Sequence, residues 1–330
     1  TKLIMKKNVA VICGGYTAER NISLGSGDVV TRNLDPQLYH IYKVLVNTDG
    51  CYVQPENIRI NMSDFSFDKN GETIKFDLVF NAIHGSPGED GRIQGYFDML
   101  QIPYTNCSAA TSALTFNKVW TKKVLAGEVN LAKGKLVKSD EIDMAATIQE
   151  ITEGFRLPLF VKPNNNGSSY GISKIKEFDT LKNAVIEALK FDTEVLVEEG
   201  ITGTEVTCGV YRYKGEIIVL PICEIVAGKH DFFDYTAKYT AGESDEIIPA
   251  RIPETEAAKV ANTSSRIYQL LNCKGVVRID YIISNGDPFF LEVNTVPGIS
   301  EASIVPKMAV ASGLTLQAFF GRLLDEAKAG

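Results

Sequence analysis

The sequence VVRIDYIISNGDPFFLEVN at residues 276–294 contains two short apolar segments that carry polar side chains at alternate positions. In a β-strand, successive side chains point to opposite faces of the sheet. The first segment then has a polar face with Arg278 and Asp280 and an apolar face with Val277, Ile279, Tyr281 and Ile283. The second segment has Phe290, Glu292 and Asn294 on one face and Phe289, Leu291 and Val293 on the other.

A loop of five turn-forming residues, 284–288, separates the two segments and predicts an antiparallel hairpin. We expect Ile283 to pair with Phe289. The polar residues that then face each other are Asp280 with Glu292 and Arg278 with Asn294.

Two carboxylates that face each other across a sheet repel, so Asp280 and Glu292 need a cation between them. Carboxylates and the amide oxygen of Asn294 are hard ligands that suit Mg²⁺, which completes its shell with substrate phosphates and water. The hairpin therefore predicts a magnesium–nucleotide site. The alternative is a solvated sheet face on which Asp280 pairs with Arg278.

The rest of the chain predicts an α/β fold with an α+β C-terminal part, divided into three domains. Residues 1–106 alternate strands and helices, which indicates a doubly wound parallel sheet, with strands at 9–12, 41–46 and 76–83 and helices at 17–33 and 92–100. Residues 107–194 form a central unit with helices at 111–126 and 180–190 and a strand at 159–162. Residues 195–330 indicate an antiparallel sheet with strands at 195–198, 204–213, 216–225, 276–283 and 288–293.

The composition is that of an ordinary globular protein, 45% hydrophobic and 23% charged over 330 residues. A net charge of -7 disfavours nucleic acid as a partner. No apolar stretch is long enough for a membrane span or a secretory signal, so we expect a cytoplasmic protein without a membrane partner. The six cysteines are widely spaced and are expected to be buried thiols.

Two loops follow predicted strands and are candidates for ligand binding. Lys162 precedes the loop 164–171, whose small and polar residues could hold phosphates through their backbone amides, although a flexible surface turn is the alternative. His84 opens the loop 84–91 at the carboxyl edge of the first sheet, where it is either a ligand contact or a satisfied loop histidine. No Walker A or complete G-x-G-x-x-G motif occurs, which disfavours a dehydrogenase.

Taken together and in order, these motifs resemble the D-alanine–D-alanine ligases of the ATP-grasp superfamily. The matching segments are GGYTAER at 14–20, HGSPGEDG at 84–91, Lys162-Pro163 with GSS at 167–169, DYTAKY at 234–239, RID at 278–280 and EVNTVPG at 292–298. The resemblance implies a three-domain ATP-grasp fold and ATP-dependent ligation of two D-alanines through an acylphosphate, for peptidoglycan synthesis.

The resemblance also implies roles for individual residues. Two Mg²⁺ ions, for which Mn²⁺ can substitute, would be held by Asp280, Glu292 and Asn294. The residues that would bind ATP are Lys118, Lys162, Glu198, Glu205 and Lys238, with Glu198 at the adenine and Glu205 at the ribose. The residues that would act on the amino acids are Glu19, Ser168, Tyr239, Arg278 and Ser303, with His84, Gly298 and Ile304 as substrate contacts.

Within these roles, Glu19 would bind the ammonium of the first D-alanine and join Ser168 and Tyr239 in a hydrogen-bonded triad. Arg278 and the Gly298 amide would stabilise the tetrahedral oxyanion. The segment 229–246 resembles the family's lid, and its Lys-Tyr pair favours the dipeptide over the D-alanine–D-lactate product. A homodimer is also implied. The alternatives are a D-lactate-forming ligase, another ATP-grasp carboxylate–amine ligase, or a nucleotide-binding module without turnover.

Overall fold

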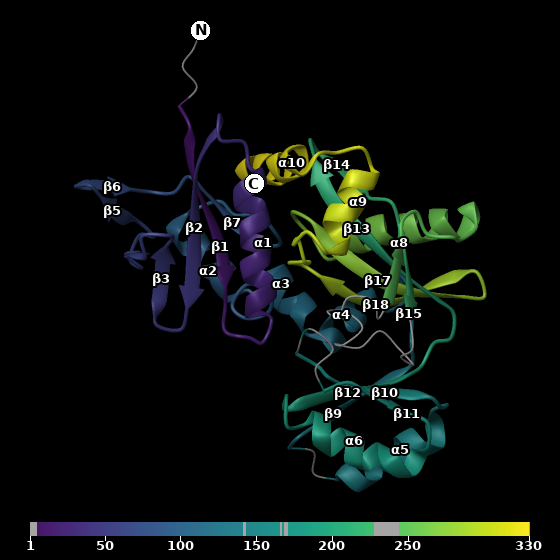
Figure 1. Cartoon of the computed structure of the whole chain (residues 1–330). Helices are drawn as coiled ribbons and strands as arrows, with labels where there is room; N and C mark the ends of the chain where they lie inside the picture. Colours follow the sequence, from purple (N-terminus) through teal and green to yellow (C-terminus); the bar gives the residue numbers. More distant parts are fainter. Residues whose placement is uncertain (1–4, 141–142, 166, 168–170, 228–243, 330) are drawn as a thin grey trace.

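The structure is a computed structural model that describes residues 5–140, 143–165, 167, 171–227 and 244–329. Its strands form a five-stranded, a four-stranded and a seven-stranded sheet together with one small two-stranded sheet. Figure 1 shows the first and the largest sheet next to each other, with the four-stranded sheet and its helices at one end. The mixed α/β architecture agrees with the predicted fold class.

The first sheet has the order β4-β3-β2-β1-β7, with β1 parallel to both of its neighbours. Val9 and Val11 of β1 pack on the side of α1 and α10, whereas Ala10 and Ile12 pack on the side of α2. The elements are β1 (Lys7–Gly14), α1 (Arg20–Asn33), β2 (Tyr39–Asn47), β3 (Gly50–Val53), β4 (Ile58–Arg59), β5 (Phe67–Lys69), β6 (Glu72–Ile74), β7 (Leu78–Asn81) and α2 (Arg92–Leu100). Both faces of the parallel strands are covered, as the sequence predicts.

The four-stranded sheet is antiparallel, in the order β11-β10-β12-β9, and packs against α5 and α6 (Figure 1). Its elements are β9 (Gly134–Lys138), α5 (Met144–Gly154), β10 (Leu159–Pro163), β11 (Ser173–Ile175), a 3-10 turn (Phe178–Thr180), α6 (Leu181–Ala188) and β12 (Glu194–Glu199). The prediction that the strand at 195–198 belongs to the last sheet is wrong, because β12 pairs with β10 and β9. Its alternation indicates a strand but not which sheet the strand joins.

The largest sheet has the order β16-β15-β13-β17-β18-β8, with β14 paired to β13. Its elements are β8 (Asn130–Leu131), β13 (Thr204–Tyr213), β14 (Glu216–Val219), β15 (Cys223–Ala227), β16 (Ser244–Ile247), α8 (Glu254–Leu270), β17 (Val277–Ser284), β18 (Asp287–Asn294), α9 (Ile304–Ala311) and α10 (Leu316–Ala329). The strand predicted at 216–225 is divided into β14 and β15, between which Pro221 lies. Proline cannot donate to a strand ladder.

The C-terminal helix α10 joins the first sheet to the largest one. Phe320 packs edge-on against Phe80 of β7, with 5.6 Å between ring centroids, and Phe319 packs edge-on against Tyr211 of β13. These aromatic side chains belong to one buried cluster that includes residues of both sheets. The shared core fixes the first sheet relative to β13, which pairs with β17.

The helix predicted at 111–126 is in fact two helices, α3 (Ala109–Phe116) and α4 (Lys118–Leu125). Asn117 interrupts them with an extended backbone, and its Oδ1 accepts a hydrogen bond of 2.9 Å from the Trp120 N–H. Asparagine is a preferred N-cap because its side chain can satisfy a free amide of the first turn. The break places Lys118 at the start of α4, where its N–H donates to Asn164 O beyond β10.

The hairpin of β17 and β18 confirms the central pairing and corrects the rest. Asp280 lies opposite Glu292 and Arg278 opposite Asn294, as predicted. The predicted pairing of Ile283 with Phe289 is wrong, because Ile283 pairs with Pro288. The connection is also shorter than the five residues expected. Ser284 pairs with Asp287, which leaves only Asn285 and Gly286 in the turn, at φ of 52° and 79°.

A β-bulge explains how both registers occur in one hairpin. The register shifts between Asp280 and Tyr281, and Leu291 is the extra residue on β18. The bulge turns Phe290 into the same buried cluster as Tyr281 and Val293. The prediction that Phe290 shares a face with Glu292 is therefore wrong. Asn-Gly favours a two-residue turn, and the bulge reconciles that turn with the pairing of the polar residues.

All six cysteines lie in described positions and are buried without disulfides, which confirms that expectation. Among the described residues, no single helix is long and apolar enough to cross a membrane. The helices α9 and α10 together are long and apolar enough to do so, but the pair is bent by 103° at the break between them.

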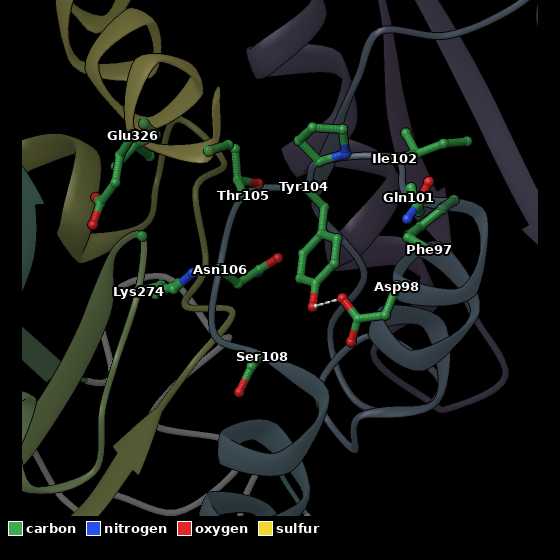
Figure 2. Close-up of a pocket in the computed structure, with 14 residues that line it drawn as sticks. Phe97, Asp98, Gln101, Ile102, Tyr104, Thr105, Asn106, Ser108, Lys274 and Glu326 are labelled. Atoms are coloured by element: carbon green, nitrogen blue, oxygen red, sulfur yellow. Dashed lines mark hydrogen bonds between the residues drawn. The ribbon is translucent and has the colours of Figure 1, made fainter. Parts of the chain in front are cut away.

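A cavity of about 320 Å³ lies where α2, the segment after it, the residues before β17 and α10 meet (Figure 2). Figure 2 shows Tyr104 on one side, with its hydroxyl donating to Asp98 at 2.8 Å, and Glu326 of α10 on the other. None of the site residues predicted from the sequence lines this cavity.

Burial raises the pKa of Glu326 to about 7 from its ordinary value of 4.5, and its Oε2 is buried without a hydrogen-bond partner among the described residues. The folded state thus retains a proton that the unfolded state releases, so stability falls as pH rises from about 4.5 to about 7. We expect Glu326→Gln to reduce this loss and to raise the melting temperature at pH 8 by about 2 °C or more.

Thermal unfolding at pH 5 and pH 8 measures this effect, with the exposed neighbour Asp325→Asn as control. An unchanged pH dependence in Glu326→Gln would show that its carboxyl is not the group responsible.

Candidate active site

The polar face of the β17–β18 hairpin is organised around the carboxylate of Asp280. Arg278 donates to it twice, from Nε to Oδ1 at 2.9 Å and from Nη2 to Oδ2 at 2.8 Å. Thr207 Oγ1 donates to Oδ1 at 2.6 Å, and Asn294 Nδ2 donates to Oδ2 at 3.3 Å. Thr207 lies on β13, directly opposite Asp280 on β17. It is not among the site residues predicted from the sequence.

The oxygen atoms of Asp280, Glu292 and Asn294 are of the chemical kind that binds Mg²⁺. Asp280 and Glu292 occupy paired positions, and the amide of Asn294 reaches the same carboxylate. Among the described residues, no three His, Cys, Asp or Glu side chains converge as a metal site, so the set consists of two carboxylates and one amide. Such a set suits Mg²⁺, which keeps waters and takes substrate phosphates as further ligands. In this structure the guanidinium of Arg278 is the cation on Asp280.

A second charged cluster lies between the four-stranded sheet and α4. Lys162 of β10 and Lys122 of α4 approach the carboxylate of Glu198 at 2.6 and 2.5 Å. Burial by itself would raise the pKa of Glu198, but the two lysine charges outweigh it and lower the pKa to about 2. Lys162 and Glu198 are predicted site residues that the structure brings together. Lys122 was missed, because a lysine within an amphipathic helix usually belongs to a solvated face.

The two clusters act on each other. Burial lowers the pKa of Lys122, and the negative charges of Glu198 and, more weakly, Glu292 oppose this. For Lys162 the same two charges outweigh burial and raise the pKa. Lys122 Nζ also lies 5.9 Å from the ring centroid of Phe290 on the same strand as Glu292. The charge of Glu292 therefore acts on the lysine cluster, and Phe290 of the same strand lies near Lys122.

The other residues that the sequence predicts to bind the nucleotide lie near strand and helix ends. Glu205 is the second residue of β13, and Glu198 is next to the last residue of β12, so the two acidic residues flank the connection between sheets, as expected from the sequence. Lys118 begins α4 and is tied by its backbone to Asn164. Lys238 lies outside the described residues.

On the side of the first sheet, Glu19 is a buried residue at the start of α1. A Cβ placed on Gly85 or on Gly167 would lie 3.0 Å from Glu19 Oε2, so both glycines lie close to its carboxylate. Ser168 and Tyr239 lie outside the described residues. The predicted triad with Glu19 therefore stays a prediction.

His84 is buried, and both of its ring nitrogens contact protein groups. Nδ1 lies 2.8 Å from Val296 O and therefore donates, whereas Nε2 lies 2.8 Å from Ser26 Oγ. Burial lowers the pKa of His84 and favours the neutral ring, in which Nε2 accepts a hydrogen bond from Ser26. His84 thus ties α1 to the segment before α9. This arrangement corresponds to the satisfied loop histidine that the sequence left open.

Glu89 in the same loop was not singled out from the sequence. It accepts a hydrogen bond of 2.8 Å from Gly85 N–H, and burial, with the charge of Glu19 as the next cause, raises its pKa to about 8. A protonated Glu89 avoids a second negative charge beside Glu19.

The residues expected for the second amino acid lie together before α9. Ser303 Oγ is 2.7 Å from Ser300 Oγ, and Ile304 is the buried first residue of α9. A Cβ on Gly298 would lie 2.8 Å from Ser303 Oγ, so only glycine fits there without a shift. Ile299 N–H donates to Ser26 Oγ at 3.4 Å, which joins this segment to α1.

Comparisons with known proteins give one consistent result. Residues 8–107 match the family model described as D-ala D-ala ligase N-terminus, and residues 126–325 match D-ala D-ala ligase C-terminus. The chain is 46% identical over 308 residues to a D-alanine–D-alanine ligase of Flavobacterium psychrophilum, covering 92% of each chain. It is 45% identical to that of Flavobacterium johnsoniae, covering 97% of this chain and 98% of the relative.

Solved structures agree with these matches. The VanG D-Ala:D-Ser ligase from Enterococcus faecalis aligns with a TM-score of 0.86 at 32% identity, covering 98% of this chain and 100% of that one. A D-alanine–D-alanine ligase from Bacillus anthracis complexed with ATP aligns with a TM-score of 0.77 at 26% identity, covering 98% of both chains.

Proposed function

Since this chain belongs to the D-alanine–D-alanine ligase family, we propose that the site around Asp280, Glu198 and Glu19 joins two D-alanine molecules at the expense of ATP. The chain is an ATP-dependent ligase that forms a carbon–nitrogen bond, and its product serves peptidoglycan synthesis. One observation supports this site most directly: Asp280 and Glu292 face each other across the hairpin, with the pair Arg278 and Asn294 beside them.

We propose that Asp280, Glu292 and Asn294 hold two Mg²⁺ ions, for which Mn²⁺ can substitute. When bound there, the metal would neutralise charge on the phosphoryl group that is transferred. Lys118 and Lys162 would contact the phosphates from the start of α4 and the end of β10. The closeness of Lys118 N–H to Asn164 O supports this pairing of elements.

The amino acids would bind between α1 and the segment before α9. Glu19 would pair with the ammonium of the first D-alanine, while Ser303, Ile304 and Gly298 would shape the place of the second. The carboxylate of the first D-alanine attacks the γ-phosphate of ATP, and ADP leaves. The amine of the second D-alanine then attacks the carbonyl carbon of the acylphosphate, and the amide forms as the amine loses a proton and phosphate leaves. Arg278 and the Gly298 amide would stabilise the oxyanion of that second step.

Ser168, Lys238 and Tyr239 would complete the site. We propose that Ser168 and Tyr239 join Glu19, and that Lys238 contacts ATP from the segment 229–246, which closes over the intermediate and excludes water.

We further propose three domains. The sequence places their bounds at 1–106, 107–194 and 195–330. Because β12 (Glu194–Glu199) pairs with β10 and β9, the central domain extends to residue 199 and the last one begins at residue 200. We also propose that the protein acts in the cytoplasm, where ATP is available, and that it forms a homodimer.

A competition between second substrates tests whether the product is the D-alanyl-D-alanine dipeptide. With ATP and D-alanine constant, D-lactate or D-serine is added as a competing acceptor, and the products are separated by mass. We expect D-alanyl-D-alanine to dominate at neutral pH. A depsipeptide or a D-alanyl-D-serine product in excess would contradict the proposed second subsite.

A further inference from the structure

The cluster of Lys122, Lys162 and Glu198 carries two positive charges for one negative charge. Its three side chains are 10%, 14% and 3% exposed, so the excess charge is held away from bulk water. The two ammonium groups repel each other, and the charge of Lys162, after burial itself, contributes to the lowered pKa of Lys122. Such a cluster favours the approach of an anion.

The two lysines differ in what surrounds them. Lys162 is next to the last residue of β10, and the chain leads directly from there into the loop 164–171. Lys122 lies within α4, and besides Glu198 its ammonium faces the ring of Phe290 at 5.9 Å. Lys162 therefore stands beside the expected phosphates, whereas Lys122 is enclosed between Glu198 and an aromatic ring.

We propose that Lys122 is a positioning residue of the nucleotide site, which keeps Glu198 paired and in place when Lys162 turns from Glu198 to the phosphates. The inference rests on the proposed function, which assigns Lys162 to the phosphates and Glu198 to the base. A buried carboxylate that loses its last cationic partner is strongly destabilised. With Lys122 present, Lys162 is released without that penalty.

The test compares binding of ADP with binding of adenosine to the full chain by titration calorimetry, both with Mg²⁺. In Lys122→Met, Lys162 has to serve both Glu198 and the phosphates. We expect the affinity for ADP to fall by about tenfold or more. Adenosine has no phosphates that would draw Lys162 away from Glu198, so the affinity for adenosine should change by less than about threefold. Lys122→Arg should retain most of the affinity for ADP.

Lys123→Met is the matched control, because Lys123 is the exposed neighbour on the same helix. It should bind both ligands like the unmodified protein. Unchanged ADP affinity in Lys122→Met would overturn the inference. An equal loss for ADP and adenosine would overturn it as well, because Lys122 would then only shape the pocket of the base.

A second pair of variants tests the inference even if the single variant Lys122→Met does not fold. In a Glu198→Gln background no carboxylate needs a partner, so adding Lys122→Met should leave ADP affinity unchanged. A further tenfold loss there would show that Lys122 contacts the nucleotide itself and would overturn the inference. Failure of the proposed function is distinguishable, since the unmodified protein would then show no D-alanine-dependent ADP formation.

Discussion

Replacing Glu292 with glutamine should leave the fold intact and lower kcat/KM for Mg–ATP by more than about 100-fold, because loss of an outer partner of a metal site already costs roughly 10- to 100-fold. Glutamine has the shape of glutamate but lacks the charge that draws a divalent ion. Glu292 faces Asp280 across the hairpin, so the substitution also relieves repulsion between the two carboxylates in the absence of metal.

Steady-state kinetics at several Mg²⁺ concentrations measure the activity, and thermal unfolding without metal measures the stability. Asp287→Asn is the matched control, because it removes a carboxylate from the exposed end of the same strand, where Asp287 pairs with Lys259 at 2.6 Å. Full activity of Glu292→Gln would exclude Glu292 as a metal ligand.

Replacing Arg278 with lysine should lower kcat by about 100- to 1,000-fold, the usual cost of losing one donor to a developing oxyanion. Lysine keeps the positive charge near Asp280 but loses the planar fork that makes both hydrogen bonds. If Arg278 acts on the bond-forming step, the Mg²⁺ dependence of the variant should stay close to that of the unmodified enzyme.

Arg251→Lys is the matched control, since Arg251 makes the same two-bond pair with Glu224 on the other side of the sheet, at 2.9 and 2.8 Å. It should change activity little. If excess Mg²⁺ restored kcat in Arg278→Lys, the role of Arg278 would be to hold Asp280 for the metal, and the oxyanion assignment would be wrong.

The hairpin shows which features the alternation of polar and apolar residues can predict and which it cannot. Alternation correctly predicted that Asp280 faces Glu292, because both polar faces follow from the period of two. It failed for Phe290, because a bulge at Leu291 shifts the register by one residue, and no local signal in the strand announces it. Asn285-Gly286 was the available clue, since this pair favours a two-residue turn.

The other corrections have a similar origin in long-range structure. Residues 111–126 have a helical pattern throughout, and Asn117 divides them because its side chain caps a second helix. The strand β12 joined a different sheet because strand pairing depends on tertiary contacts that a short segment does not encode. Motif order, by contrast, spans the whole chain, and therefore the fold class was predictable.

Site residues that belong to a sequence motif could be predicted, whereas those that reach the site only through tertiary packing could not. Lys162 and Glu198 carry a recognisable pattern, and the structure brings them together. Lys122 lies four residues after Lys118 in an ordinary amphipathic helix, so only the packing of α4 against β12 reveals that it is buried beside Glu198. Thr207 was missed for the same reason, since its contact with Asp280 comes from cross-strand pairing.

The most direct test of the whole account is ADP formation by the full chain with ATP and Mg²⁺, in the presence and absence of D-alanine, with the product identified by mass. We expect ADP and D-alanyl-D-alanine to appear in equal amounts, and L-alanine to be inactive. ADP release that is driven by L-amino acids or a larger acid and not by D-alanine would contradict the central claim.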